Sequence, residues 1–117
     1  MYKLVILIDH SKNEEALNDL WPKFLQQAEQ MPGLLKETTS RIDKVLYGEY
    51  SCSMIHELYF DSVRTLQEAM SSPPGQAAGE ILQKMTAGKM TLLLADHRED
   101  NLENIRKYKP KNFNYDE

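Results

Sequence analysis

The fold is decided by the stretch Ile55–Ala78, which reads I-H-E-L-Y-F-D-S-V-R-T-L-Q-E-A-M-S-S-P-P-G-Q-A-A. Its apolar and aromatic run Leu58–Phe60 ends at Asp61 and Ser62. Beyond that point the spacing of apolar residues changes from two to about 3.6, which is typical of a strand that passes directly into a helix. The run Ser71–Gly75 then interrupts the helix, and helical spacing resumes after it.

Upstream of this stretch, the sequence predicts one buried strand and one amphipathic helix. Leu4–Ile8 is a continuous run of leucine, valine and isoleucine, which is typical of a strand buried on both faces. Over residues 13–31 the apolar side chains form a single helical stripe. Pro22 lies within that stripe, so we expect a kink or a break there, and Pro32 with Gly33 should end the helix.

The chain between the first helix and the tail predicts three more strands. Leu34–Leu46 has the threonine and valine content of a more exposed strand. Tyr47–Tyr50 forms a hairpin-like connection into a third strand over Cys52–Phe60. Met90–Ala95 is nearly all apolar and reads as a fourth strand.

The element order is β-α-β-β-α-β, which places the chain in the α+β class. Right-handed crossovers put the first and third strands at the centre of a four-stranded antiparallel sheet, with both helices on one face. This is a ferredoxin-like sandwich. The first and last strands are apolar on both faces, and each buried Leu or Ile contributes roughly 1.5–3 kcal/mol. We therefore expect the helix-free face to pack against the same face of a second copy, giving a homodimer.

The C-terminal composition predicts a tail outside this domain. Residues 1–97 form the predicted domain, and residues 98–117 are charged and poor in core residues. Leu102, Ile105 and Tyr108 could form a short amphipathic turn within the tail. We expect an arm that docks on the domain or on its partner, and a fold that survives removal of the tail.

Charge and cysteine content exclude several classes of function. Acidic residues outnumber basic ones by 18 to 14, and the net charge of −4 gives no electrostatic basis for binding nucleic acid or an anionic membrane. The single cysteine, Cys52, cannot form an internal disulfide, which favours a reducing cytoplasm. The apolar run Leu4–Ile8 is too short for a signal sequence or a membrane span.

Several segments of the chain resemble a known family. Glu57–Ser62, with Leu66–Ala69 and Ser72–Ala78 after it, resembles the EthD family of dimeric α/β-barrel proteins, and so do Met31–Leu34 and Thr91–Leu94. The resemblance covers about Tyr2–Asp96. The family takes its name from ethyl tert-butyl ether degradation, and related barrels include lactone isomerases, polyketide cyclases and cofactor-free monooxygenases. The resemblance implies a ligand pocket within each subunit, between the helices and the sheet.

Alternation along the third strand places the pocket residues. Its more apolar set of side chains should face the helices, and the opposite set, including Glu57 and Tyr59, should face the dimer barrel. The helical stripe adds Phe24 from the first helix. The predicted pocket residues are Phe24, Met54, His56, Leu58 and Phe60.

The chain departs from the family in its first helix. Many members carry a histidine eight residues before the proline of the Pro-Gly turn, and the corresponding residue here is Phe24. His56 is then the candidate titratable group, either as a hydrogen-bonded core residue or as a pocket base. His10 and His97 should lie at opposite ends of the sheet, so they cannot share a metal within one subunit.

Other candidates are weaker in the sequence. Glu57 and Tyr59 would need partners across a dimer interface or would frame a second cavity. Cys52 has no adjacent base that would make it a nucleophile. The chain has no phosphate-binding loop, no dinucleotide-binding glycine pattern and no paired-cysteine zinc spacing, so it predicts neither a cofactor nor a metal.

Two functions remain open from the sequence. The first is a protein that binds a small hydrophobic metabolite, aromatic or alicyclic, and is accessory to a degradation pathway. The second is a cofactor-independent oxidoreductase, or an isomerase or cyclase, that acts on such a metabolite. Both would use the same pocket, and the missing helix histidine favours the first.

Overall fold

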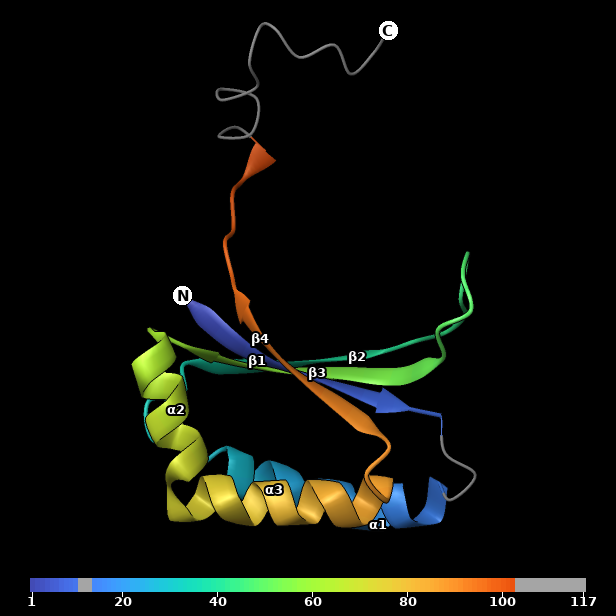
Figure 1. Cartoon of the computed structure of the whole chain (residues 1–117), viewed down its shortest axis with the longest axis horizontal. Helices are drawn as coiled ribbons and strands as arrows, with labels where there is room; N and C mark the ends of the chain where they lie inside the picture. The colour runs from blue at the N-terminus through green and yellow to red at the C-terminus, as the bar shows by residue number, and fades with distance from the viewer. Residues whose placement is uncertain (11–13, 103–117) are drawn as a thin grey trace, which may run out of the picture.

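A computed structural model describes residues 1–10 and 14–102. Four strands form one antiparallel sheet in the order β2-β3-β1-β4, with β1 and β3 at its centre (Figure 1). The strands are β1 (Tyr2–Asp9), β2 (Lys36–Arg41), β3 (Cys52–Phe60) and β4 (Met90–Asp96). The chain is therefore a ferredoxin-like α+β sandwich, as the sequence predicted.

The helices cover one face of the sheet only. They are α1 (Glu14–Ala28), α2 (Val63–Ser71) and α3 (Pro73–Thr86). α1 and α3 pack side by side under the sheet, and α2 joins the end of β3 to α3 (Figure 1). None of these helices is both long and apolar enough to cross a bilayer, within the residues that the structure describes.

Two serines cap the helices that follow β3, at the positions predicted from Ile55–Ala78. The Ser62 side chain accepts a hydrogen bond from the Thr65 N–H and caps the start of α2. Ser72 ends α2 and caps α3, because its hydroxyl accepts from the Gly75 N–H. The two prolines follow at the first positions of α3, where a missing N–H costs nothing.

Of the kink or break predicted at Pro22, the break does not occur. α1 runs unbroken from Glu14 to Ala28 with Pro22 inside it, so the proline does not break the helix. Proline in a helix interior costs about 3 kcal/mol. Burial of the apolar stripe on both sides of it, including Phe24 and Ala28, offsets this, at roughly 1.5–3 kcal/mol for each large side chain. Ala28 is followed by a turn in which Gly33 has a φ of 80°.

The core lies between the helices and the sheet. β1 is buried on both faces, with Ile6 1% exposed on the helix side and Val5 8% exposed on the helix-free side. β4 is also apolar, but Leu92, Leu93 and Leu94 are 42, 45 and 54% exposed. Three adjacent leucines on an edge strand therefore remain uncovered in the single chain. Of the predicted tail turn, Leu102 is exposed, and Ile105 and Tyr108 lie outside the described residues.

Candidate functional site

His56 lies at the centre of β3 and faces the helices, as alternation along the strand predicts. Its side chain is fully buried. The imidazole meets two aromatic rings of α1 edge-on, with centroid distances of 5.1 Å to Trp21 and 5.7 Å to Phe24. Trp21 and Phe24 in turn stack on each other at 5.2 Å. Aromatic side chains of α1 thus cover the face of β3 at this position.

Two side chains of β2 occupy both ring nitrogens of His56. The Thr39 hydroxyl lies 2.8 Å from Nδ1, and Glu37 Oε2 lies 3.0 Å from Nε2. A neutral ring satisfies both contacts, because Nε2–H donates to the carboxylate and Nδ1 accepts from the hydroxyl. Burial lowers the pKa of His56, and the hydrogen bond and charge of Glu37 oppose this only in part. The ring is therefore neutral near pH 7.

This shift predicts that acid destabilises the fold through His56. The pKa of His56 in the folded chain lies below the ordinary value of 6.5, so between these two pKa values the unfolded chain binds more protons. The stability contributed by His56 is complete above pH 6.5 and is lost as the pH falls toward the folded-state pKa. The free energy of unfolding should fall by at most about 1.4 kcal/mol per pH unit in this window. Urea denaturation between about pH 5 and pH 7.5 measures it.

A His56→Phe variant is the matched control for this measurement. Phenylalanine keeps a ring between Trp21 and Phe24 but cannot take a proton. His10 and His97 are present in both chains, so they cancel in the difference. The variant should lose the slope below pH 6.5, and an identical slope in both chains would assign the titration to another group.

A separate apolar cavity of about 200 Å³ lies between α3 and the sheet. Side chains of β1, β3, β4 and all three helices or their ends contribute to it. Gln76 is the single polar side chain among its lining residues in the described part of the chain. The lining residues are Leu4, Ile6, Phe24, Met31, Leu58, Met70, Gly75, Gln76, Ala78, Gly79, Leu82 and Leu92.

The cavity brings together only part of the predicted pocket. Phe24 and Leu58 line it. His56 and Phe60 are fully buried and are not among its lining residues. Met54 lines a different, more polar hollow of about 360 Å³ near the start of α1. Phe24 contacts both His56 and the cavity, because its ring packs edge-on against His56 and also forms part of the cavity wall.

The cavity opens toward solvent between α3 and β4. Met70 and Leu92 belong to its lining and are 38 and 42% exposed. A shallower hollow of about 340 Å³ continues along α3 and shares Gln76, Gly79, Leu82 and Leu92 with the cavity. A molecule can therefore reach the cavity from this side. Helix α3 was not part of the predicted pocket.

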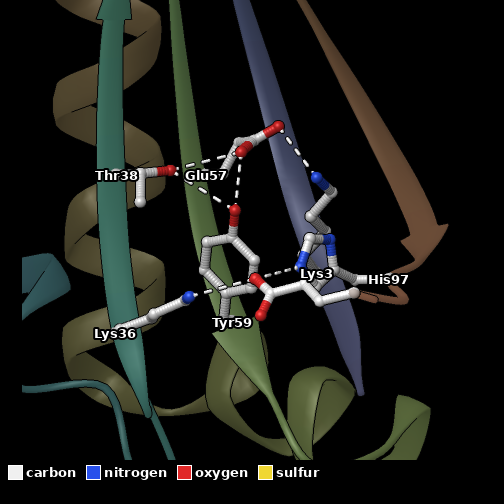
Figure 2. Close-up of polar contacts among 7 residues, drawn as sticks. Lys3, Lys36, Thr38, Glu57, Tyr59 and His97 are labelled. Atoms are coloured by element: carbon white, nitrogen blue, oxygen red, sulfur yellow. Dashed lines mark hydrogen bonds and ion pairs between the residues drawn. The ribbon is translucent and has the colours of Figure 1, made fainter. Parts of the chain in front are cut away.

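A second polar cluster lies on the helix-free face of the sheet, around Glu57 (Figure 2). Its carboxylate accepts hydrogen bonds from the Tyr59 hydroxyl at 2.8 Å, from Lys3 Nζ at 3.1 Å and from Thr38 at 3.2 Å. Partial burial acts to raise the pKa of Glu57, but these three donors outweigh it and the pKa lies below the ordinary value of 4.5. The predicted polar pair of Glu57 and Tyr59 thus finds its partners within one chain.

The C-terminal end of β4 completes that cluster. The His97 ring packs edge-on against Tyr59 at 4.9 Å, and Lys36 Nζ lies 4.7 Å from the centre of the same ring (Figure 2). Glu99 bridges these two residues, at 2.8 Å from His97 and 3.4 Å from Lys36. His97 lies beside Met1, at the end of the sheet opposite His10, as predicted. Among residues 1–10 and 14–102, no cluster of His, Cys, Asp and Glu could hold a metal.

Comparison with known proteins identifies the fold. No protein-family model matches the sequence, and no curated protein matches it. Among solved structures, an EthD family protein from Bacillus halodurans superposes with a TM-score of 0.77 at 25% identity, over 84% of this chain and 99% of that chain. In its structure, the chain is EthD-like.

Two further structures share the fold of the EthD-like chain. A dimeric ferredoxin-like protein of unknown function from Jannaschia sp. CCS1 has a TM-score of 0.62 and 16% identity, covering 82% of this chain and 97% of that one. SnoaB, a cofactor-independent oxygenase from Streptomyces nogalater, has a TM-score of 0.60 and 14% identity, covering 85 and 93%. At such identities the likeness shows the fold alone.

Proposed function

We propose that this EthD-like chain binds a small, neutral, hydrophobic molecule, aromatic or alicyclic, in the cavity beneath α3. The observation that carries the proposal is the cavity itself, whose wall is apolar apart from Gln76. Apolar protein cavities of about 150 Å³ stay dry and bind benzene. A volume of about 200 Å³ therefore suits one substituted ring. None of the described lining residues is charged, which disfavours a phosphate or a sugar.

The site chemistry supports binding better than acid–base catalysis. A pocket base needs a nitrogen within hydrogen-bond reach of the bound molecule. Both nitrogens of His56 already have partners, Thr39 and Glu37, and the Phe24 ring contacts His56 and walls the cavity. We therefore assign the chain an accessory binding role, of the kind that a degradation pathway for hydrophobic compounds would use. A cofactor-independent oxidoreductase or isomerase is the alternative.

Calorimetric titration with toluene, glucose and inorganic phosphate tests the proposal. Toluene should bind and should raise the melting temperature in a concentration-dependent way, because a ligand that binds only the folded state stabilises it. Glucose and phosphate should do neither. If toluene gives no heat and no thermal shift up to its solubility limit, the proposed function is wrong.

We also propose that two copies associate through their helix-free sheet faces. Leu93 of β4 lies on this face and is 45% exposed, and in the connection between β2 and β3 Leu46 and Tyr47 are 87 and 99% exposed. That connection rises on the side of the sheet away from the helices (Figure 1). Exposed apolar groups in such a concentration are typical of an interface. The Jannaschia relative, with the same fold, is described as dimeric.

Neighbouring leucines of β4 provide a matched test of this interface. Leu93 pairs with Val5 and shares its helix-free face, whereas Leu94 pairs with Leu4 and shares the helix face. Leu93→Asp should shift the chain from dimer to monomer, because an unpaired carboxylate is costly to bury. Leu94→Asp, on a residue of similar exposure, should leave the dimer intact. Sedimentation velocity at micromolar concentration measures both, and a monomeric unmodified chain would contradict the proposed interface.

A further inference from the structure

Gln76 is placed to select the ligand. It lies in the first turn of α3, and it lines both the cavity and the shallower hollow that continues along the helix. Every other lining residue of the cavity is apolar or glycine. The amide of Gln76 is therefore the one side-chain group in the described residues that could form a hydrogen bond with a bound molecule there.

A hydrogen bond to the end of α2 fixes the orientation of the Gln76 amide. Gln76 Nε2 donates to the backbone carbonyl of Ser71 at 3.2 Å. A carbonyl oxygen can only accept, so the amide nitrogen must face Ser71, and this assigns the two ends of the side chain. The carbonyl oxygen of Gln76 is left available as an acceptor, and the second N–H of the amide is left available as a donor.

We infer that the ligand carries a hydroxyl group, as in a phenol or an alicyclic alcohol, which donates to the Gln76 carbonyl oxygen while the ring fills the cavity. This inference rests on the proposed function and narrows its ligand class. An acceptor at the mouth of an apolar cavity favours a donor on the ligand, because an unmatched hydroxyl would lose its hydrogen bonds to water on entry. A hydroxyl group can pair with either end of the amide, whereas a ketone or an ether oxygen could use only its second N–H.

Phenol and toluene are the paired probes, since they differ only by a hydroxyl in place of a methyl group. Gln76→Met keeps the length of the side chain and removes its hydrogen-bonding groups. Gln83→Met is the control, because Gln83 lies on the same helix and lines only the shallower hollow. The dissociation constant of each probe is measured by calorimetry for the unmodified chain and for both variants.

Gln76→Met should weaken phenol binding about three- to tenfold, which corresponds to one neutral hydrogen bond. It should leave toluene binding within about twofold of the unmodified chain, and Gln83→Met should change neither constant. If both probes bind and Gln76→Met alters them equally or not at all, the inference about Gln76 is overturned and the cavity still binds a ring. If neither probe binds the unmodified chain, the proposed function fails and this inference fails with it.

Discussion

Replacing Gly75 with alanine should destabilise the fold by about 2–3 kcal/mol, the cost of overpacking at a site that cannot relax. Gly75 lies where α3 begins against the end of α2. A Cβ there would collide with the backbone carbonyl oxygen of Ala69 and would lie 2.8 Å from that of Met70. Both are backbone atoms held by the Ser72 junction, so neither can move aside cheaply.

Replacing Gly79, one turn later in the same helix, with alanine should have the opposite effect on stability. A Cβ at Gly79 would meet nothing within 4 Å. Gly79→Ala should therefore stabilise the chain by about 0.5–1 kcal/mol, because alanine loses less backbone entropy in a helix. Urea denaturation of both variants measures the two effects. Equal destabilisation by Gly75→Ala and Gly79→Ala would show that the packing at the α2–α3 junction is not as described.

Gly79→Leu should abolish toluene binding without unfolding the chain. Gly79 lines the cavity, and the space beyond its Cα is open, so a leucine side chain can enter the volume that a ligand would occupy. We expect the affinity for toluene to fall at least about tenfold, beyond the loss of any single hydrogen bond. Calorimetric titration checks the affinity, and the thermal melting curve checks the fold.

Gly79→Ala is the control for this loss. It gives the same backbone effect but adds a single methyl group, so toluene should still bind. If Gly79→Leu binds toluene as tightly as the unmodified chain, the ligand lies elsewhere. The hollow beside Met54 would then be the alternative location.

The sequence predicted the fold well because its strongest signals are local. The period change after Phe60 and the serine–proline junction set the end of β3 and the starts of α2 and α3. The bounds of β3, Cys52–Phe60, agree with the prediction. The sequence left open whether α1 continues through Pro22, because the cost of the proline is local whereas the burial that offsets it depends on tertiary packing.

The site was less predictable, because it depends on contacts between elements. Alternation placed His56 toward the helices, and the stripe of α1 brought Phe24 against it. Glu37 was missed as a partner of His56, because the register of β2 against β3 is not fixed by the long connection between them. The contribution of α3 to the cavity depends on how that helix rotates over β1 and β4, which its weakly patterned sequence does not specify.

Phe24 occupies the position at which the family resemblance implies a histidine. Where many members of that family carry a histidine, this chain has an aromatic ring that packs on His56 and walls the cavity. The substitution exchanges a titratable group for an apolar surface. Under the proposed function, such a site would hold a neutral ring by contact, because none of its described lining residues is an acid or a base.

The methionine methyl groups allow the most direct test of the cavity as a ligand site. Met31 and Met70 line it, whereas Met54 lines the separate hollow near the start of α1. A titration of methyl-labelled methionine with toluene, followed by NMR, should shift the Met31 and Met70 signals together and give nuclear Overhauser effects from both methyl groups to the ring. The Met54 signal should not move. Shifts at Met54 with Met31 and Met70 unchanged would contradict the proposed site.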